Sequence, residues 1–121
     1  MTIAYWIVGG ITALLWLVAG GQKTFRSREA LAPMMAWAPT FPAAAVKAIG
    51  IAEILGALGL ILPPLTGIAP WLAFVAAIAL LLVQVIAIVF HLVRGEVKVL
   101  GFNALITVLT AVTVWLATIW L

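Results

Sequence analysis

Apolar residues fill four long runs along this chain of 121 residues, and polar residues gather in the links between the runs. The runs span residues 2–20, 44–62, 68–93 and 99–121. A helix that crosses a membrane needs about 20 predominantly apolar residues. Because lipid offers the backbone no hydrogen-bond partners, such runs are expected to be helical. The pattern predicts an all-α integral membrane four-helix bundle, a single membrane domain over residues 1–121, in which short links make sequential helices antiparallel.

The first link, residues 21–43, is the only long polar stretch. Three prolines break any continuous helix in it: Pro33, Pro39 and Pro42. Apolar and aromatic residues lie between them: Met34, Met35, Trp37 and Phe41. Two interpretations stay open, a segment lying in the membrane interface and a plain loop. Another proline pair, Pro63-Pro64, is expected to end the second run.

Composition supports the membrane assignment, because 68% of the residues are apolar and only 7% are charged. A soluble domain carries about 25% charged residues, and a disordered chain is poor in apolar ones. The net charge of +3 is compatible with nucleic-acid binding. However, the few basic residues are scattered at the ends of the apolar runs, which is typical of membrane orientation, so no nucleic-acid partner is expected. The chain has no cysteine, which excludes disulfides, Cys-ligated zinc and iron–sulfur clusters within it.

All six basic residues fall in or beside the first and third links: Lys23, Arg26, Arg28, Lys47, Arg94 and Lys98. With four spans, these two links lie on the same side of the membrane. The positive-inside bias places links 21–46 and 94–98 in the cytoplasm of a bacterium and both termini outside. A cleaved signal peptide is the competing interpretation of the first run, but no basic residue precedes Thr2, as such a peptide requires.

Five polar residues are expected in the basic half of the bilayer: Lys23, Glu53, Gln84, His91 and Asn103. At about 1.5 Å rise per residue, Glu53 and Gln84 each lie about 13 Å from the basic end of their helices, and Asn103 about 6 Å. Polar groups in hydrocarbon are costly and tend to face the bundle interior. We therefore expect one polar cavity that opens toward the basic side, with Glu53 pointing into the bundle.

Two roles are open for Glu53. It is either a structural clasp that hydrogen-bonds Gln84 or Asn103, or part of a ligand or proton site in which Lys23, Lys47 or His91 supplies a cation. No metal site is expected, because Glu53 and His91 do not supply the three or four ligands that zinc needs. No catalytic residue is assigned. Three glycines in the second run predict close helix packing: Gly50, Gly56 and Gly59.

Several motifs follow one another in a characteristic order: Gly20-Gly21-Gln22-Lys23, Gly50-Ile51-Ala52-Glu53, Gly56, Gly59-Leu60-Ile61-Leu62-Pro63, His91-Leu92-Val93-Arg94-Gly95-Glu96 and Asn103. In these motifs the whole chain resembles the DoxX-like family of small four-helix membrane proteins. The resemblance implies a four-helix membrane bundle. It also implies a link to thiosulfate:quinone oxidoreductase subunits and to redox or oxidative-stress assemblies in bacterial membranes. Some redox relatives depend on cysteines, which this chain lacks.

Three functions fit these observations. The first is an accessory subunit of a quinone-linked or redox membrane system, without a cofactor of its own and with a redox partner subunit or a second copy as partner. The second is a binding site for a small amphipathic ligand, such as a quinone, in the cavity around Glu53. The third is a transporter or channel component, for which four spans are few unless the chain oligomerises.

Overall fold

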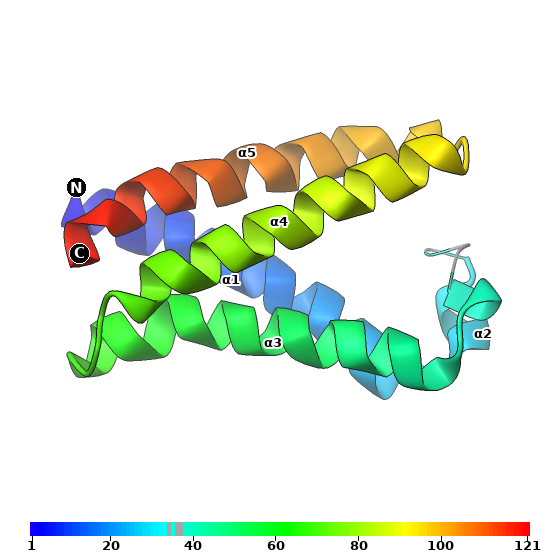
Figure 1. Ribbon diagram of the computed structural model, residues 1–121, viewed down its shortest axis with the longest axis horizontal. Coiled ribbons are helices and arrows are strands. Elements are labelled where there is room, and N and C mark those ends of the chain that lie inside the picture. Colours follow the sequence, from blue (N-terminus) through cyan, green and yellow to red (C-terminus); the bar gives the residue numbers. More distant parts are fainter. Residues whose placement is uncertain (34, 36–37) are drawn as a thin grey trace.

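Four long helices run side by side in the computed structural model, which describes residues 1–33, 35 and 38–121 (Figure 1). The long helices are α1 (Thr2–Phe25), α3 (Ala43–Thr66), α4 (Leu72–Val93) and α5 (Leu100–Ala117). The short ones are α2 (Arg28–Leu31), η1 (Ala38–Thr40), η2 (Val97–Val99) and η3 (Thr118–Trp120). The predicted all-α membrane bundle is confirmed.

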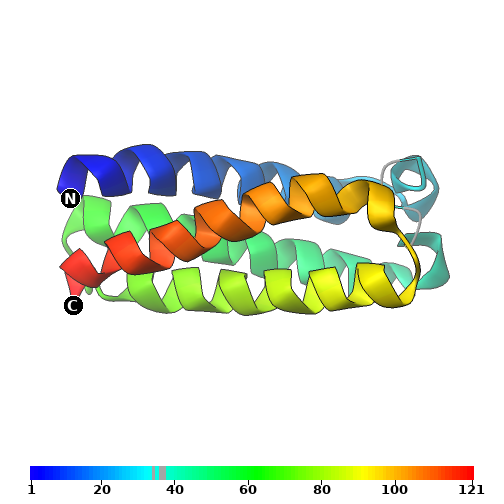
Figure 2. The same ribbon diagram turned by 90° about the horizontal axis from the view of Figure 1, so that it is seen from above.

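Each long helix packs against its neighbours in sequence, and α1 also packs against α5, which closes the bundle. Both termini lie at one end of the bundle, and the first link and the α4–α5 turn lie at the other (Figure 2). The four helices, with α5 continued to Trp120, are long and apolar enough to cross a membrane. Large apolar side chains such as Ile3, Ile86 and Leu105 are exposed around them, as expected for a surface in contact with lipid.

The helix α3 differs from the sequence prediction, because it continues through Pro63 and Pro64 to Thr66. Proline has no backbone N–H, so Pro64 leaves the carbonyl oxygen of Leu60 without its helical donor. The hydroxyl of Tyr5, on α1, donates to that oxygen at 2.5 Å. A side chain from a neighbouring helix thus replaces the missing backbone donor, and α3 remains helical for one more turn.

Glycines set the closest helix contacts. At the crossing of α1 and α3, a methyl group built on Gly50 would lie 2.7 Å from the carbonyl oxygen of Gly20. A side chain at either position would therefore force the backbones apart. On another side of α3, a methyl group on Gly56 would meet the Leu80 side chain at 2.6 Å, and one on Gly59 would meet Ala76 at 2.9 Å. The three glycines therefore pack α3 against two helices, α1 and α4.

The described part of the first link folds back onto the bundle. Leu31 and Ala38 are buried together with Val46 of α3. The ring of Phe41 lies 5.5 Å from that of Phe90, near the end of α4. This part of the link is therefore anchored to the ends of two helices. The expected interfacial residues Met34 and Trp37 lie outside the described residues.

Candidate functional site

The first polar pair joins α1 to α3 beside the glycine crossing. Lys23 lies three residues after Gly20 and Glu53 three residues after Gly50, so both follow the crossing by about one helical turn. The Lys23 ammonium donates to both Glu53 carboxylate oxygens, reaching Oε2 at 2.7 Å. Glu53 is 1% exposed and the Lys23 side chain 13%. Lys23 therefore extends from the polar end of the bundle to a carboxylate inside it, as a long side chain can.

The second polar pair joins α4 to α5. The Gln84 side-chain amide donates to Asn103 at Oδ1, 2.9 Å away, and at the backbone oxygen, 3.0 Å away. Gln84 is 3% exposed. The hydroxyl of Thr107 donates to the same Asn103 backbone oxygen at 2.7 Å. These bonds hold two helices together through groups that would be costly to leave unpaired in lipid.

The third polar group lies at the α4–α5 turn. His91 Nδ1 is 3.1 Å from Glu96 Oε1, and Arg94 Nε donates to the same oxygen at 3.0 Å. Desolvation raises the pKa of the Glu96 carboxyl, but the hydrogen bonds and positive charges of His91 and Arg94 outweigh it and hold the pKa below its ordinary value. The sequence analysis did not single out Glu96. The sequence feature that could have indicated this contact is the position of Glu96 two residues after Arg94, in a tight turn.

The five predicted site residues thus appear in three groups. The structure brings Lys23 together with Glu53 and Gln84 together with Asn103, whereas His91 binds Glu96. Two kinds of partner were open for Glu53, an amide of Gln84 or Asn103 and a cation such as Lys23, and in the structure the partner is Lys23. The reason is geometric, because the glycine crossing brings the Lys23 side chain against Gly50, and its long stem reaches along α3 to Glu53.

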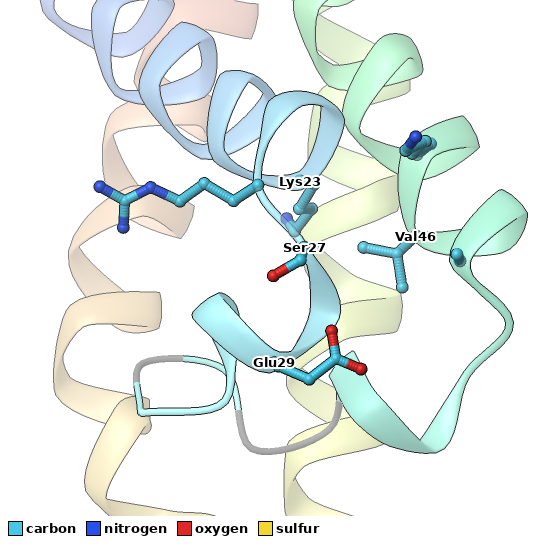
Figure 3. A pocket seen from close by; sticks show the side chains of 7 residues that line it. Lys23, Ser27, Glu29 and Val46 are labelled. Carbon is cyan, nitrogen blue, oxygen red and sulfur yellow. The ribbon is translucent and has the colours of Figure 1, made fainter.

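A cavity of about 240 Å³ opens at the basic end of the bundle, between the end of α1, the start of α2 and the first turn of α3 (Figure 3). Seven residues line it: Lys23, Arg26, Ser27, Glu29, Ala43, Val46 and Lys47. Of the five predicted residues, only Lys23 belongs to this lining. The cavity therefore lies nearer the basic end than the one expected around Glu53, with the Lys23–Glu53 pair adjoining it.

Sequence reasoning used Arg26 only to orient the chain, considered Lys47 as a cation for Glu53, and did not assign Ser27 or Glu29 to a site. The available signal was that Lys23 and Arg26 are three residues apart in sequence. Arg26, however, is the C-cap of α1 and has an extended backbone, so helical spacing does not place it on the face of Lys23. Their meeting with Lys47 depends on how α1 and α3 cross, which no local pattern specifies.

The structure also contains a polar contact between α1 and α5 that the sequence analysis missed. The hydroxyls of Thr12 and Thr113 are 3.0 Å apart, and the Trp16 indole N–H donates to the Thr110 hydroxyl at 3.2 Å. These residues are buried and lie deeper in the bundle than the basic end. They therefore support helix packing and do not extend the cavity.

Within the described part of the chain, no three His, Asp or Glu residues gather as a metal ion would require. A family model described as the DoxX-like family matches residues 7–113. No curated protein and no solved structure matches the chain.

Proposed function

Because this chain belongs to the DoxX-like family, we propose that it is a non-catalytic accessory subunit of a quinone-linked or other redox system in the membrane. The observation that carries the proposal is the pairing of buried polar groups between helices. Both Glu53 oxygens bind Lys23, and the Gln84 amide binds Asn103. Polar groups that hydrogen-bond each other between two helices stabilise helix packing. They favour a rigid scaffold over a reaction centre.

The redox assignment is supported by the family resemblance in the motifs around Lys23, Glu53 and His91. The chain has no cysteine to anchor an iron–sulfur cluster or relay electrons through thiols. Under this proposal the electron carriers belong to a partner subunit. The exposed apolar sides of α1, α3, α4 and α5 are available to contact that partner within the bilayer.

The test is purification of the tagged full chain from its native membranes after mild cross-linking, with untagged membranes as the control. We expect a partner subunit in fixed ratio to the chain, together with electron transfer to an added quinone. Membranes lacking the chain should lose part of that activity. A single, partner-free species with its own turnover would contradict the accessory role.

A second candidate function is the binding of an amphipathic ligand such as a quinone, with its polar head near Glu53. One observation favours it. Lys23 binds Glu53 and also lines the open cavity, so it connects a buried carboxylate with the polar end of the bundle. Quinone reduction consumes protons as electrons arrive from a partner subunit, and the Lys23–Glu53 pair can pass a proton from the polar end of the bundle to the quinone.

Quinone titration of the purified chain tests this second candidate. We expect Glu53→Gln to weaken binding. The double variant Lys23→Gln/Glu53→Gln, which replaces the ion pair by two neutral amides, controls for loss of the Lys23–Glu53 charge balance. Equal quinone binding by all three forms would exclude Glu53 from the site.

We further propose that the basic end faces the cytoplasm of a bacterial membrane. All six Lys and Arg residues lie at or near this end, in agreement with the positive-inside bias. Because the chain has no native cysteine, a thiol reagent reacts only with a cysteine introduced by mutation. A membrane-impermeant maleimide should label Leu65→Cys in intact cells and Ser27→Cys only after lysis. The reverse pattern would invert the orientation.

A further inference from the structure

Lys23 lies between two carboxylates. Its ammonium donates to both oxygens of the buried Glu53, and its side chain also lines the cavity at the basic end. Glu29, in the first turn of α2, lines the same cavity. In Figure 3 the labelled Lys23 and Glu29 side chains border one space, the first from α1 and the second from α2. One carboxylate therefore lies on the inner side of Lys23, and a second lies on its open side.

The two carboxylates differ in burial and in their partners. Glu53 is 1% exposed, whereas Glu29 is an exposed residue. Within the described residues, no cation is paired with Glu29. The volume of the cavity, about 240 Å³, is well above the approximately 30 Å³ that one water molecule occupies in the liquid. Glu29 therefore borders a space that is large enough for an ammonium group to enter.

The attraction between Lys23 and Glu53 depends on the charge of the carboxyl. A hydrogen bond between two ions is stronger than one to a neutral group, and a buried charge that loses its partner charge is strongly destabilising. When the Glu53 carboxyl is neutral, the Lys23 ammonium is therefore poorly compensated where it lies. A lysine stem is flexible and places its charge in water where it can. Because the Lys23 stem already borders the cavity, its rotation can carry the ammonium towards Glu29.

We propose that Lys23 alternates between these two carboxylates, bound to Glu53 while that carboxyl is ionised and turned into the cavity towards Glu29 once it is protonated. The proton comes from solvent at the open end of the cavity and attaches to a Glu53 oxygen. Lys23 keeps its own charge throughout. The movement uncovers a carboxyl that has a proton to donate. When that proton leaves, the Glu53 carboxylate binds Lys23 again.

This inference deepens the second candidate function, because it states how the site around Glu53 receives its proton. A quinone that is reduced by electrons from a partner subunit takes the proton from Glu53, and the return of Lys23 then closes the site. The two helices packed against α3 are α1 and α4. Arg26 and Lys47 line the cavity, and His91 of α4 binds Glu96. Within the described residues, Lys23 is therefore the one cation that binds Glu53.

Zero-length cross-linking tests the second position of Lys23. The purified full chain in a neutral detergent is treated with a water-soluble carbodiimide, which joins an amine to a carboxylate in direct contact with loss of one water molecule. Peptide mass spectrometry measures the Lys23–Glu29 cross-link, and Glu29→Gln should abolish it. We expect Glu53→Gln, which imitates the protonated carboxyl, to raise the yield about tenfold over the native chain, because Lys23 loses a charged hydrogen-bond partner.

Gln84→Met is the matched control variant, because it removes a buried hydrogen bond between α4 and α5 and leaves the Lys23–Glu53 pair in place. It should change the yield less than about twofold. Equal yields in the native chain and in Glu53→Gln would overturn the proposal. An equal rise in Gln84→Met would also overturn it, since that indicates a general loosening of the bundle.

Two features keep the outcome clear. If Glu53→Gln does not fold, Glu53→Met, with an apolar side chain of similar volume, takes its place with the same expected rise. No quinone is present during cross-linking. A failure of the native chain to bind quinone and a failure of Lys23 to reach Glu29 are therefore separate results.

Discussion

Replacement of Tyr5 by phenylalanine removes the hydrogen bond that the Tyr5 hydroxyl makes between α1 and α3. The Tyr5 hydroxyl donates to the carbonyl oxygen of Leu60, and both residues are completely buried, at 0% exposure. Phenylalanine keeps the ring and its edge-to-face contacts with Trp6 and Trp120, whose centroids lie 5.5 and 5.4 Å away. Tyr5→Phe therefore removes the donor and leaves the packing intact.

The expected loss follows from the position of Leu60 in α3. Its carbonyl oxygen has no helical donor, because residue 64 is proline. A buried acceptor left unsatisfied costs about 1–3 kcal/mol. Interhelical hydrogen bonds in membrane proteins reach at most about 1.7 kcal/mol. We therefore expect Tyr5→Phe to lower the free energy of unfolding by about 1.5 kcal/mol, within both ranges.

A double-mutant cycle with Pro64 tests whether the Tyr5 hydroxyl replaces the missing backbone donor. Pro64→Ala restores the backbone N–H that can reach Leu60, so in that background Tyr5→Phe should cost less than about 0.5 kcal/mol. Pro63→Ala is the control, because its N–H would serve the carbonyl of Gly59, and the cost of Tyr5→Phe should stay at about 1.5 kcal/mol. The measurement is reversible unfolding in mixed micelles, followed by circular dichroism. An equal cost in all three backgrounds would refute the replacement of the backbone donor by Tyr5.

Three further predictions concern packing, the ion pair and the α4–α5 turn. Gly50→Ala should destabilise the bundle by about 1–3 kcal/mol in micelle unfolding, because its methyl group meets backbone. Gly10→Ala, with no atom within 4 Å, should stabilise it by roughly 0.5–1 kcal/mol; equal effects would contradict the close crossing. Glu53→Gln should cost about 3 kcal/mol by removing the carboxylate charge that binds the Lys23 ammonium, and adding Lys23→Gln should recover part of that loss; no recovery would argue against an ion pair. Because the pKa of Glu96 is lowered by folding, its contribution to stability is present above its unfolded pKa of about 4.5 and is lost as the pH falls through the lower native value. The protection factors for hydrogen exchange at the turn, taken relative to the intrinsic rate at each pH, should fall over that acidic range in the native chain and not in Glu96→Gln.

The sequence was sufficient to predict the all-α class, the four spans and their antiparallel order. Hydrophobic length and the need for the backbone to satisfy its own hydrogen bonds are properties of each segment alone, so they can be read without knowing the neighbours. A similar depth for Glu53 and Gln84 is a further prediction, made from helical rise alone. Helix ends were less predictable. The end of α3 was placed at Pro63-Pro64, because the donor that lets the helix continue comes from Tyr5, far away in sequence.

The choice of partners was decided only by the tertiary structure. The sequence offered several candidates for Glu53, and the close approach of Gly20 to Gly50 brings Lys23 to it. The cavity at the basic end also depends on the tertiary structure, since its lining comes from the end of α1, the start of α2 and the start of α3. Depth along one helix is a local quantity, whereas rotation of one helix against another depends on every side chain at their interface.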